Sequence, residues 1–132
     1  MKPLILIADD DAKHRKLLTD VLQAEGYDTL TVENGERVVG LARSAKPGLI
    51  VMDVQMPVLD GLSAVKVLKS DPGTRSIHVI AVTALAMRDD RERMFAAGFD
   101  GYLSKPISIK GLRAEVKRLI CAEPAQTEVI GH

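Results

Sequence analysis

Residues 4–10 read Leu4-Ile5-Leu6-Ile7-Ala8-Asp9-Asp10, a short aliphatic run that ends directly on two carboxylates. Three later apolar runs are also followed by a polar residue: residues 49–52 by Asp53, residues 79–82 by Thr83, and residues 102–103, after one intervening serine, by Lys105. Runs of this kind are typical of parallel strands that are buried on both faces. We therefore expect the polar residues to gather at the carboxyl edge of one sheet, where open α/β sheets bind ligands.

Amphipathic stretches lie between the apolar runs, as expected for a succession of βα units. Strands are expected at residues 4–8, 27–32, 49–52, 77–82 and 100–104. Helices are expected over residues 12–25, after Asn34-Gly35, after Gly61, over residues 88–97 and after Ser108. Their predicted inward faces include Leu17, Phe95 and Ile109. The pattern predicts an α/β fold in which helical crossovers cover a five-stranded parallel sheet.

The composition narrows the classes of function. The 132 residues suffice for one domain with a substantial core, and 18 basic residues balance 18 acidic ones. The basic residues are dispersed, so we do not expect nucleic acid as a partner. A membrane span needs about 20 apolar residues, and no apolar stretch approaches that length, so we do not expect a membrane as a partner either. The single cysteine and an N-terminus without a signal peptide favour the cytoplasm. We expect one domain over residues 1–121 and a flexible tail over residues 122–132.

Three of the polar residues expected at the sheet edge are carboxylates, namely Asp9, Asp10 and Asp53. Crowded carboxylates repel each other, and a divalent cation commonly relieves this repulsion. Mg²⁺ suits such a site because it takes hard oxygen ligands and keeps several waters. With Asp53 as nucleophile, Lys105 as a positive charge and Thr83 as a hydroxyl donor, the set meets the needs of metal-assisted phosphoryl transfer.

Each of these residues also has a simpler interpretation. An Asp after a strand often caps the next helix, and a Thr or Lys there often only ends the strand. Four separate elements would have to place the groups together by chance, so their joint spacing favours a site. Pro106 can follow Lys105 through a cis peptide bond at low cost. His14, on the first expected helix, fits contact with a phosphodonor and simple solvation equally well.

Residues 3–121 resemble the receiver domain of two-component response regulators. The features that carry the resemblance keep the family's order and spacing: Asp9-Asp10, Met52-Asp53-Val54-Gln55-Met56-Pro57-Val58-Leu59-Asp60-Gly61, Val82-Thr83-Ala84 and Lys105-Pro106. Within the family, the chain is similar to stand-alone regulators of the DivK cell-division type. The resemblance implies a flavodoxin-like, doubly wound (βα)5 fold whose strands have the order 2-1-3-4-5.

The resemblance also implies roles for the acidic residues. Asp53 would accept a phosphoryl group from a phosphohistidine on a sensor histidine kinase or a histidine phosphotransfer protein, and so become an aspartyl phosphate. Mg²⁺ would be held by Asp10, Asp53 and the backbone carbonyl of Gln55, while Asp9 would help through water.

Phosphorylation is expected to change the surface of the molecule. By resemblance, Thr83 and Lys105 would contact the phosphoryl oxygens, Thr83 would be drawn inward, and Tyr102 would be favoured in a buried position. The fourth helix, fifth strand and fifth helix would then present a new surface to a downstream target protein or kinase. The resemblance implies a signalling switch and not a turnover enzyme.

Two other functions are compatible with a related architecture. A phosphatase of the haloacid dehalogenase type also uses an Asp nucleophile after a strand, but it requires Asp-x-Asp-x-Thr, whereas Asp53 precedes Val54-Gln55-Met56-Pro57. A flavin-binding, flavodoxin-like protein requires a phosphate-binding loop after the first strand, where Asp9-Asp10-Asp11 would repel phosphate. The receiver accounts for more of the sequence than either alternative.

Overall fold

Five parallel strands form the centre of the computed structural model, which describes residues 2–84 and 90–121. The strands are β1 (Leu4–Ala8), β2 (Asp28–Val32), β3 (Leu49–Asp53), β4 (His78–Thr83) and β5 (Gly101–Ser104). Their order is β2-β1-β3-β4-β5, and every neighbouring pair is parallel. The predicted strand order is thus confirmed. The direction of winding reverses between β1 and β3, and the carboxyl end of such a switch point is where ligands bind.

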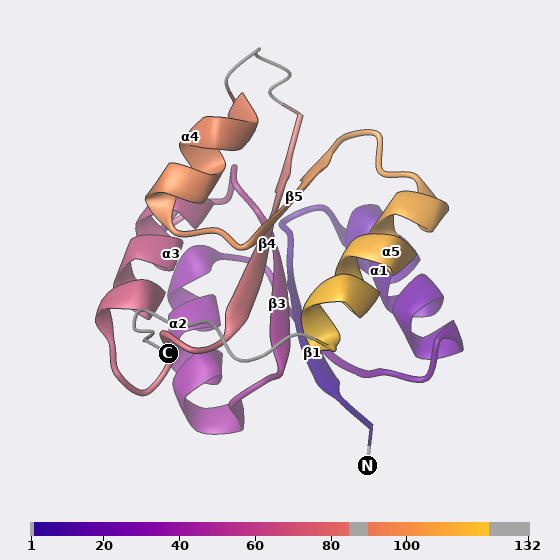
Figure 1. Ribbon diagram of the computed structural model, residues 1–132, viewed down its shortest axis with the longest axis horizontal. Helices are drawn as coiled ribbons and strands as arrows, with labels where there is room; N and C mark the ends of the chain where they lie inside the picture. The colour runs from indigo at the N-terminus through magenta and orange to yellow at the C-terminus, as the bar shows by residue number, and fades with distance from the viewer. Residues whose placement is uncertain (1, 85–89, 122–132) are drawn as a thin grey trace, which may run out of the picture.

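Helices cover both faces of the sheet (Figure 1). On one face lie α1 (Ala12–Ala24) and α5 (Ile109–Ile120), and on the other lie α2 (Gly35–Ala45), α3 (Gly61–Ser70) and α4 (Asp90–Ala97). Alternate residues of β1 contact different layers: Ile5 and Ile7 belong to the core under α1 and α5, Leu6 and Ala8 to the other core. Burial on both faces is the reason why the strand sequences are continuously apolar. The predicted doubly wound α/β fold is confirmed.

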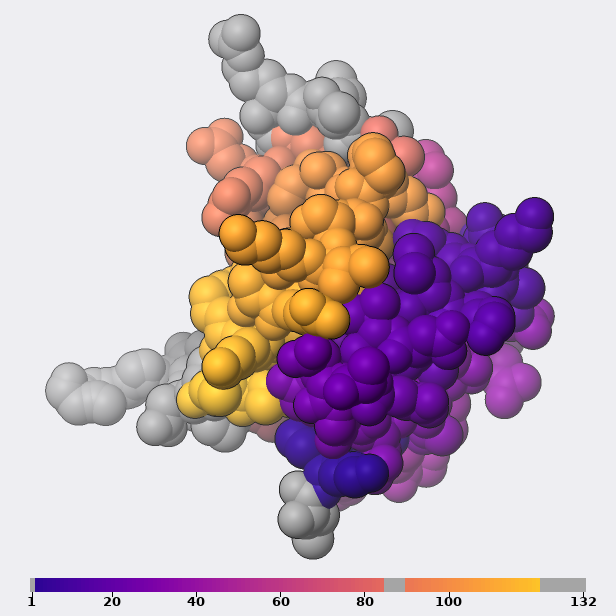
Figure 2. All heavy atoms as spheres, turned by 90° about the vertical axis from the view of Figure 1, so that its right-hand side faces the viewer, coloured from indigo at the N-terminus to yellow at the C-terminus, as the bar shows by residue number. Residues whose placement is uncertain are grey.

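The layer formed by α1 and α5 faces the viewer in Figure 2. The violet α1 and the yellow-orange α5 lie side by side in this view. Arg113 of α5 joins Glu25, at the end of α1, through an ion pair with an Nε–Oε2 distance of 3.0 Å. Both side chains are solvent-exposed, so apolar packing beneath them contributes more to holding the helices together than this pair does.

Side chains cap four of the helices at their N-termini. Asp11, Asn34, Asp60 and Ser108 each accept a hydrogen bond from a backbone N–H in the first helical turn. Each cap satisfies a donor that has no partner within the helix. All four lie in loops that leave the carboxyl edge of the sheet, so the helices begin close to the strand ends.

Three side chains predicted to face the core are exposed instead, and those predictions were wrong. Leu17 is 43% exposed, Phe95 37% and Ile109 45%. Leu17 lies at the margin of the α1 stripe, the guanidinium of Arg91 lies 5.5 Å from the Phe95 ring centre, and Ile109 is the first residue of α5. Helical periodicity gives the direction of a side chain but not whether a neighbouring element covers it. The predicted helix start at residue 88 and the predicted tail, residues 122–132, lie outside the described residues.

Candidate functional site

The register of the sheet brings the candidate residues to one edge. Three register pairs stand near the carboxyl ends of the strands: Ala8 with Met52, Asp53 with Val82, and Thr83 with Ser104. Asp53 and Thr83 belong to these pairs, and Asp9 and Lys105 each follow a paired residue by one position. All four residues therefore lie at the same level of the sheet. The parallel arrangement therefore gathers groups that are distant in the sequence.

Asp53 ends β3 with a buried carboxylate that accepts two hydrogen bonds. Nζ of Lys105 donates to Oδ2 at 2.7 Å, and the backbone N–H of Gln55 donates to Oδ1 at 2.9 Å. Burial opposes the charge on Lys105, but the hydrogen bond to Asp53 and the fields of Asp53, Asp9 and Asp10 outweigh it and raise the pKa of Lys105. Lys105 is therefore a cation at neutral pH and balances the charge of Asp53.

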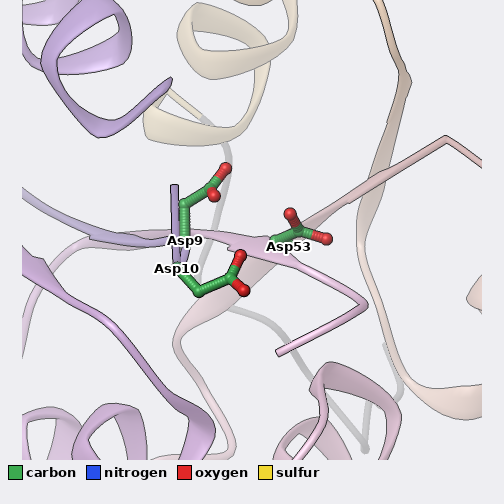
Figure 3. A group of neighbouring side chains, drawn as sticks. All are labelled: Asp9, Asp10 and Asp53. Carbon is green, nitrogen blue, oxygen red and sulfur yellow. The ribbon is translucent and has the colours of Figure 1, made fainter. Parts of the chain in front are cut away.

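Asp9 and Asp10 point to different sides of the chain as it leaves β1, and Asp10 extends toward Asp53 (Figure 3). Asp9 is buried: its Oδ1 accepts the N–H of Asp11 at 2.9 Å, and its Oδ2 contacts Nδ1 of His14. Asp10 is exposed. The first carboxylate is thus held by its own loop and helix, whereas the second is accessible from solvent.

The three carboxylates are close enough to share one cation. One oxygen from each of Asp9, Asp10 and Asp53 lies within 4.8 Å of the others. The ammonium of Lys105 contacts only Asp53 among them by a direct hydrogen bond, so negative charge is in excess. Hard oxygen donors with excess negative charge fit a divalent cation of the Mg²⁺ type.

The loop after β3 approaches the site closely. The N–H of Gly61 donates to the carbonyl oxygen of Val54 at 2.8 Å. A Cβ at position 61 would lie 2.7 Å from the backbone oxygen of Asp53 and 2.8 Å from Cα of Val54. Glycine is therefore required where α3 begins, because any side chain would displace the backbone next to Asp53.

A strained turn lies further along the same loop. The N–H of Leu59 donates to the carbonyl oxygen of Pro57 at 2.7 Å, across Val58, whose φ is 69°. A positive φ is a rare conformation for a β-branched residue, and the i to i+2 hydrogen bond marks a γ-turn. Val58 is 74% exposed. The segment from Gln55 to Pro57, together with Asp10, lines a hollow of about 530 Å³ beside the site.

Thr83 and Tyr102 lie on the same face of the sheet. Tyr102 pairs with Ala81, which is two residues before Thr83 in β4. Thr83 is fully buried, whereas Tyr102 is half-buried against the core under α2, α3 and α4. The hydroxyl of Tyr102 donates to Oδ2 of Asp90, the first residue of α4, at 2.9 Å.

The peptide bond between Lys105 and Pro106, beyond β5, is cis.

Sequence reasoning missed several partners of the site residues. His14 is half-buried and contacts Asp9, and Nη1 of Arg15 donates to the backbone oxygen of Asp9 at 2.7 Å. Asp90 was not assigned either, because an acid in a first helical turn usually needs no explanation beyond the helix dipole. The sequence feature that indicates contact of His14 and Arg15 with the acidic residues is their position in the helix that begins directly after Asp9-Asp10-Asp11.

The parallel α/β fold, with its acidic cluster and the Asp53–Lys105 pair at the carboxyl edge of the sheet, is the arrangement expected of a signalling receiver domain. The chain belongs to the response regulator receiver domain family, whose model matches residues 5–117. It is 44% identical over 109 residues to the polar-differentiation response regulator DivK of Brucella anthropi, and the match covers 83% of this chain and 89% of that protein. The predicted similarity to the DivK type is confirmed.

Solved structures show the same fold. The receiver domain of a Pseudomonas aeruginosa sensor histidine kinase has a TM-score of 0.85 and 31% identity, covering 92% of this chain and 100% of that one. That structure has a magnesium ion coordinated in its active-site cleft. The chemotaxis response regulator CheY4 of Vibrio cholerae has a TM-score of 0.84 and 25% identity, and the match covers 90% of this chain and 99% of that one.

These relationships decide between the functions considered from sequence. The chain is a signalling domain of two-component phosphorelays, and the phosphatase and flavin-binding alternatives are not supported. Within residues 2–84 and 90–121, no helix has both the length and the apolar character needed to span a bilayer.

Proposed function

We propose that Asp53 accepts a phosphoryl group from a phosphohistidine on a sensor histidine kinase or histidine phosphotransfer protein, in an Mg²⁺-dependent reaction in the cytoplasm. The observation that carries the proposal is the buried carboxylate of Asp53, 2.7 Å from the ammonium of Lys105 and within 4.8 Å of oxygens from two further aspartates. This arrangement supports a nucleophile that is held in one orientation and lies next to a positive charge.

In the proposed reaction an oxygen of Asp53 attacks phosphorus, the N–P bond of phosphohistidine breaks, and the histidine nitrogen keeps the electron pair. Lys105 and the hydroxyl of Thr83 would donate hydrogen bonds to the transferred oxygens. Hydrolysis of the aspartyl phosphate later restores the carboxylate. The chain would catalyse its own phosphorylation and dephosphorylation but would not turn over a substrate in the manner of an enzyme.

The residues present fit Mg²⁺ as cofactor. The ion would be held by Asp10, Asp53 and the backbone carbonyl of Gln55, with Asp9 acting through water. When bound, it would neutralise the negative charge that accumulates as the phosphoryl group approaches the acidic cluster. The position of Asp10 supports this role, because its exposed carboxylate faces Asp53 and borders the hollow beside the loop.

The test is incubation of the wild-type chain and Asp53→Ala with Mg²⁺ and acetyl phosphate, followed by mass measurement of the intact protein. We expect one phosphoryl group on the wild type, none on Asp53→Ala, and none on the wild type after chelation of Mg²⁺. Asp20→Asn, which changes an exposed acid on α1, is the matched control and should be labelled normally. Equal labelling of wild type and Asp53→Ala, or labelling of neither, contradicts the proposal.

The proposed output is protein binding through the surface of α4, β5 and α5, to a downstream target protein or kinase. Thr83 and Tyr102 support this route because they share a sheet face and connect the site to α4. Neither nucleic acid nor a membrane is a proposed partner. A binding screen with the phosphorylated chain, and with Asp53→Ala as control, would identify the target.

A further inference from the structure

Asp90, at the start of α4, is a fully buried carboxylate outside the acidic cluster. Its Oδ2 accepts the hydroxyl of Tyr102 at 2.9 Å, and its Oδ1 has no hydrogen-bond partner among the described residues. The guanidinium of Arg93 lies 3.6 Å from Oδ1 but is itself half exposed. Carboxylates are seldom fully buried, and when they are, they usually have more hydrogen-bond partners than Asp90 has within residues 2–84 and 90–121.

The interaction joins two elements that the proposed switch must move relative to each other. Tyr102 belongs to β5, and Asp90 begins the helix that packs beside it. Burial, the hydrogen bond to Asp90 and the negative field of Asp90 together raise the pKa of Tyr102, so its hydroxyl keeps its proton and remains a donor. Tyr102 also lies next to Thr83 on the same sheet face, through its register partner Ala81.

We propose that Asp90 is a latch that holds Tyr102 in the conformation of the unphosphorylated chain and thereby sets the threshold for switching. This inference rests on the proposed function and deepens it. In this proposal, Tyr102 releases Asp90 when it moves to a more buried position, and the buried carboxylate then loses the hydrogen bond from the Tyr102 hydroxyl. A hydrogen bond to a charged group shifts an equilibrium by about tenfold or more. Asp90 acts as a positioning residue, because it contacts Tyr102 and not the phosphoryl site.

The chain has only two tyrosines, Tyr27 and Tyr102, so labelling with 3-fluorotyrosine gives two ¹⁹F signals and an internal reference. The wild type, Asp90→Asn and Asp90→Leu are titrated with beryllium fluoride in the presence of Mg²⁺, as a mimic of the phosphoryl group. The control is Glu92→Gln, which removes an exposed negative charge from the same helix.

We expect the resting Tyr102 signal to move toward its activated position in both Asp90 variants. Half-conversion should need about tenfold less mimic in Asp90→Leu, about threefold less in Asp90→Asn, and the wild-type amount in Glu92→Gln. If the wild type responds and the Asp90 variants coincide with Glu92→Gln, the latch is refuted while the proposed function stands. If the wild type neither responds to beryllium fluoride nor accepts a phosphoryl group from acetyl phosphate, the proposed function is refuted, and the latch, which rests on it, is refuted as well.

A second measurement does not depend on switching. Denaturant unfolding of Asp90→Asn, Tyr102→Phe and the double variant forms a double-mutant cycle. We expect the effect of the double variant on the unfolding equilibrium constant to differ at least fivefold from the product of the effects of the two single variants. Additive effects would show that the two side chains do not stabilise each other, and would overturn the latch.

Discussion

At the scale of single residues, Asp53 and Lys105 are separated by 52 positions in the chain and by 2.7 Å in the fold. Both were identified from sequence because each follows an apolar run in an order that a parallel sheet converts into proximity. His14 and Asp90 could not be assigned in this way. Their contacts depend on side-chain conformations between a helix and a neighbouring strand end, and no short sequence pattern encodes these.

The strain at Val58 leads to a prediction about stability. Asn tolerates a positive φ better than a β-branched residue does, so Val58→Asn should raise the free energy of unfolding by about 1 kcal/mol. Val58 is highly exposed, so the substitution removes little packing. Val58→Ala is the comparison, because it also shortens the side chain but keeps the unfavourable φ. Urea denaturation should rank the Asn variant above the Ala variant, and the reverse order would show that the turn is not strained.

At the scale of elements, the four capped helices begin within one residue of their predicted starts, because capping is local. Asp11, Asn34, Asp60 and Ser108 act within three residues of their own positions. The predicted inward faces were less accurate, as Ile109 shows, because cover depends on how far the neighbouring layer extends.

Two glycines in helices predict opposite responses to alanine. At Gly40, in α2, a Cβ would meet nothing within 4 Å, so Gly40→Ala should stabilise the chain by about 1 kcal/mol through helix propensity. At Gly61, in α3, the Cβ would meet the backbone at 2.7 Å, so Gly61→Ala should destabilise it by about 1–3 kcal/mol.

Urea denaturation measures both glycine variants, and acetyl phosphate labelling should be slower in Gly61→Ala only, because the displaced backbone is that of Asp53. Equal stability of the two variants would show that the backbone of Asp53 and Val54 moves away from the added Cβ at little cost in free energy.

At the scale of the whole molecule, stability should fall in alkaline solution. Lys105 and Tyr102 both have pKa values raised by folding, from ordinary values of 10.5 and 10.0. The unfolded chain loses these protons first as the pH rises, so the stabilisation is complete below the unfolded pKa values and is lost as the pH passes through the folded ones.

Urea midpoints measured between about pH 8 and pH 11 should therefore decline from about pH 10 upward. The decline should be shallower in Tyr102→Phe, which lacks one of the titrating groups. A midpoint that stays constant over this range, or the same slope in both proteins, would contradict the assignment.

The sequence by itself determined the strands, the capped helix starts, the α/β class and the polar residues that follow the strands. These features depend on periodicity and on hydrogen bonds between residues close in the chain. Only the tertiary structure decided which side chains meet: Lys105 with Asp53, His14 with Asp9, and Asp90 with Tyr102. Such contacts depend on strand register and on the packing of helices across the sheet. Those are properties of residues far apart in the chain, and no local pattern specifies them.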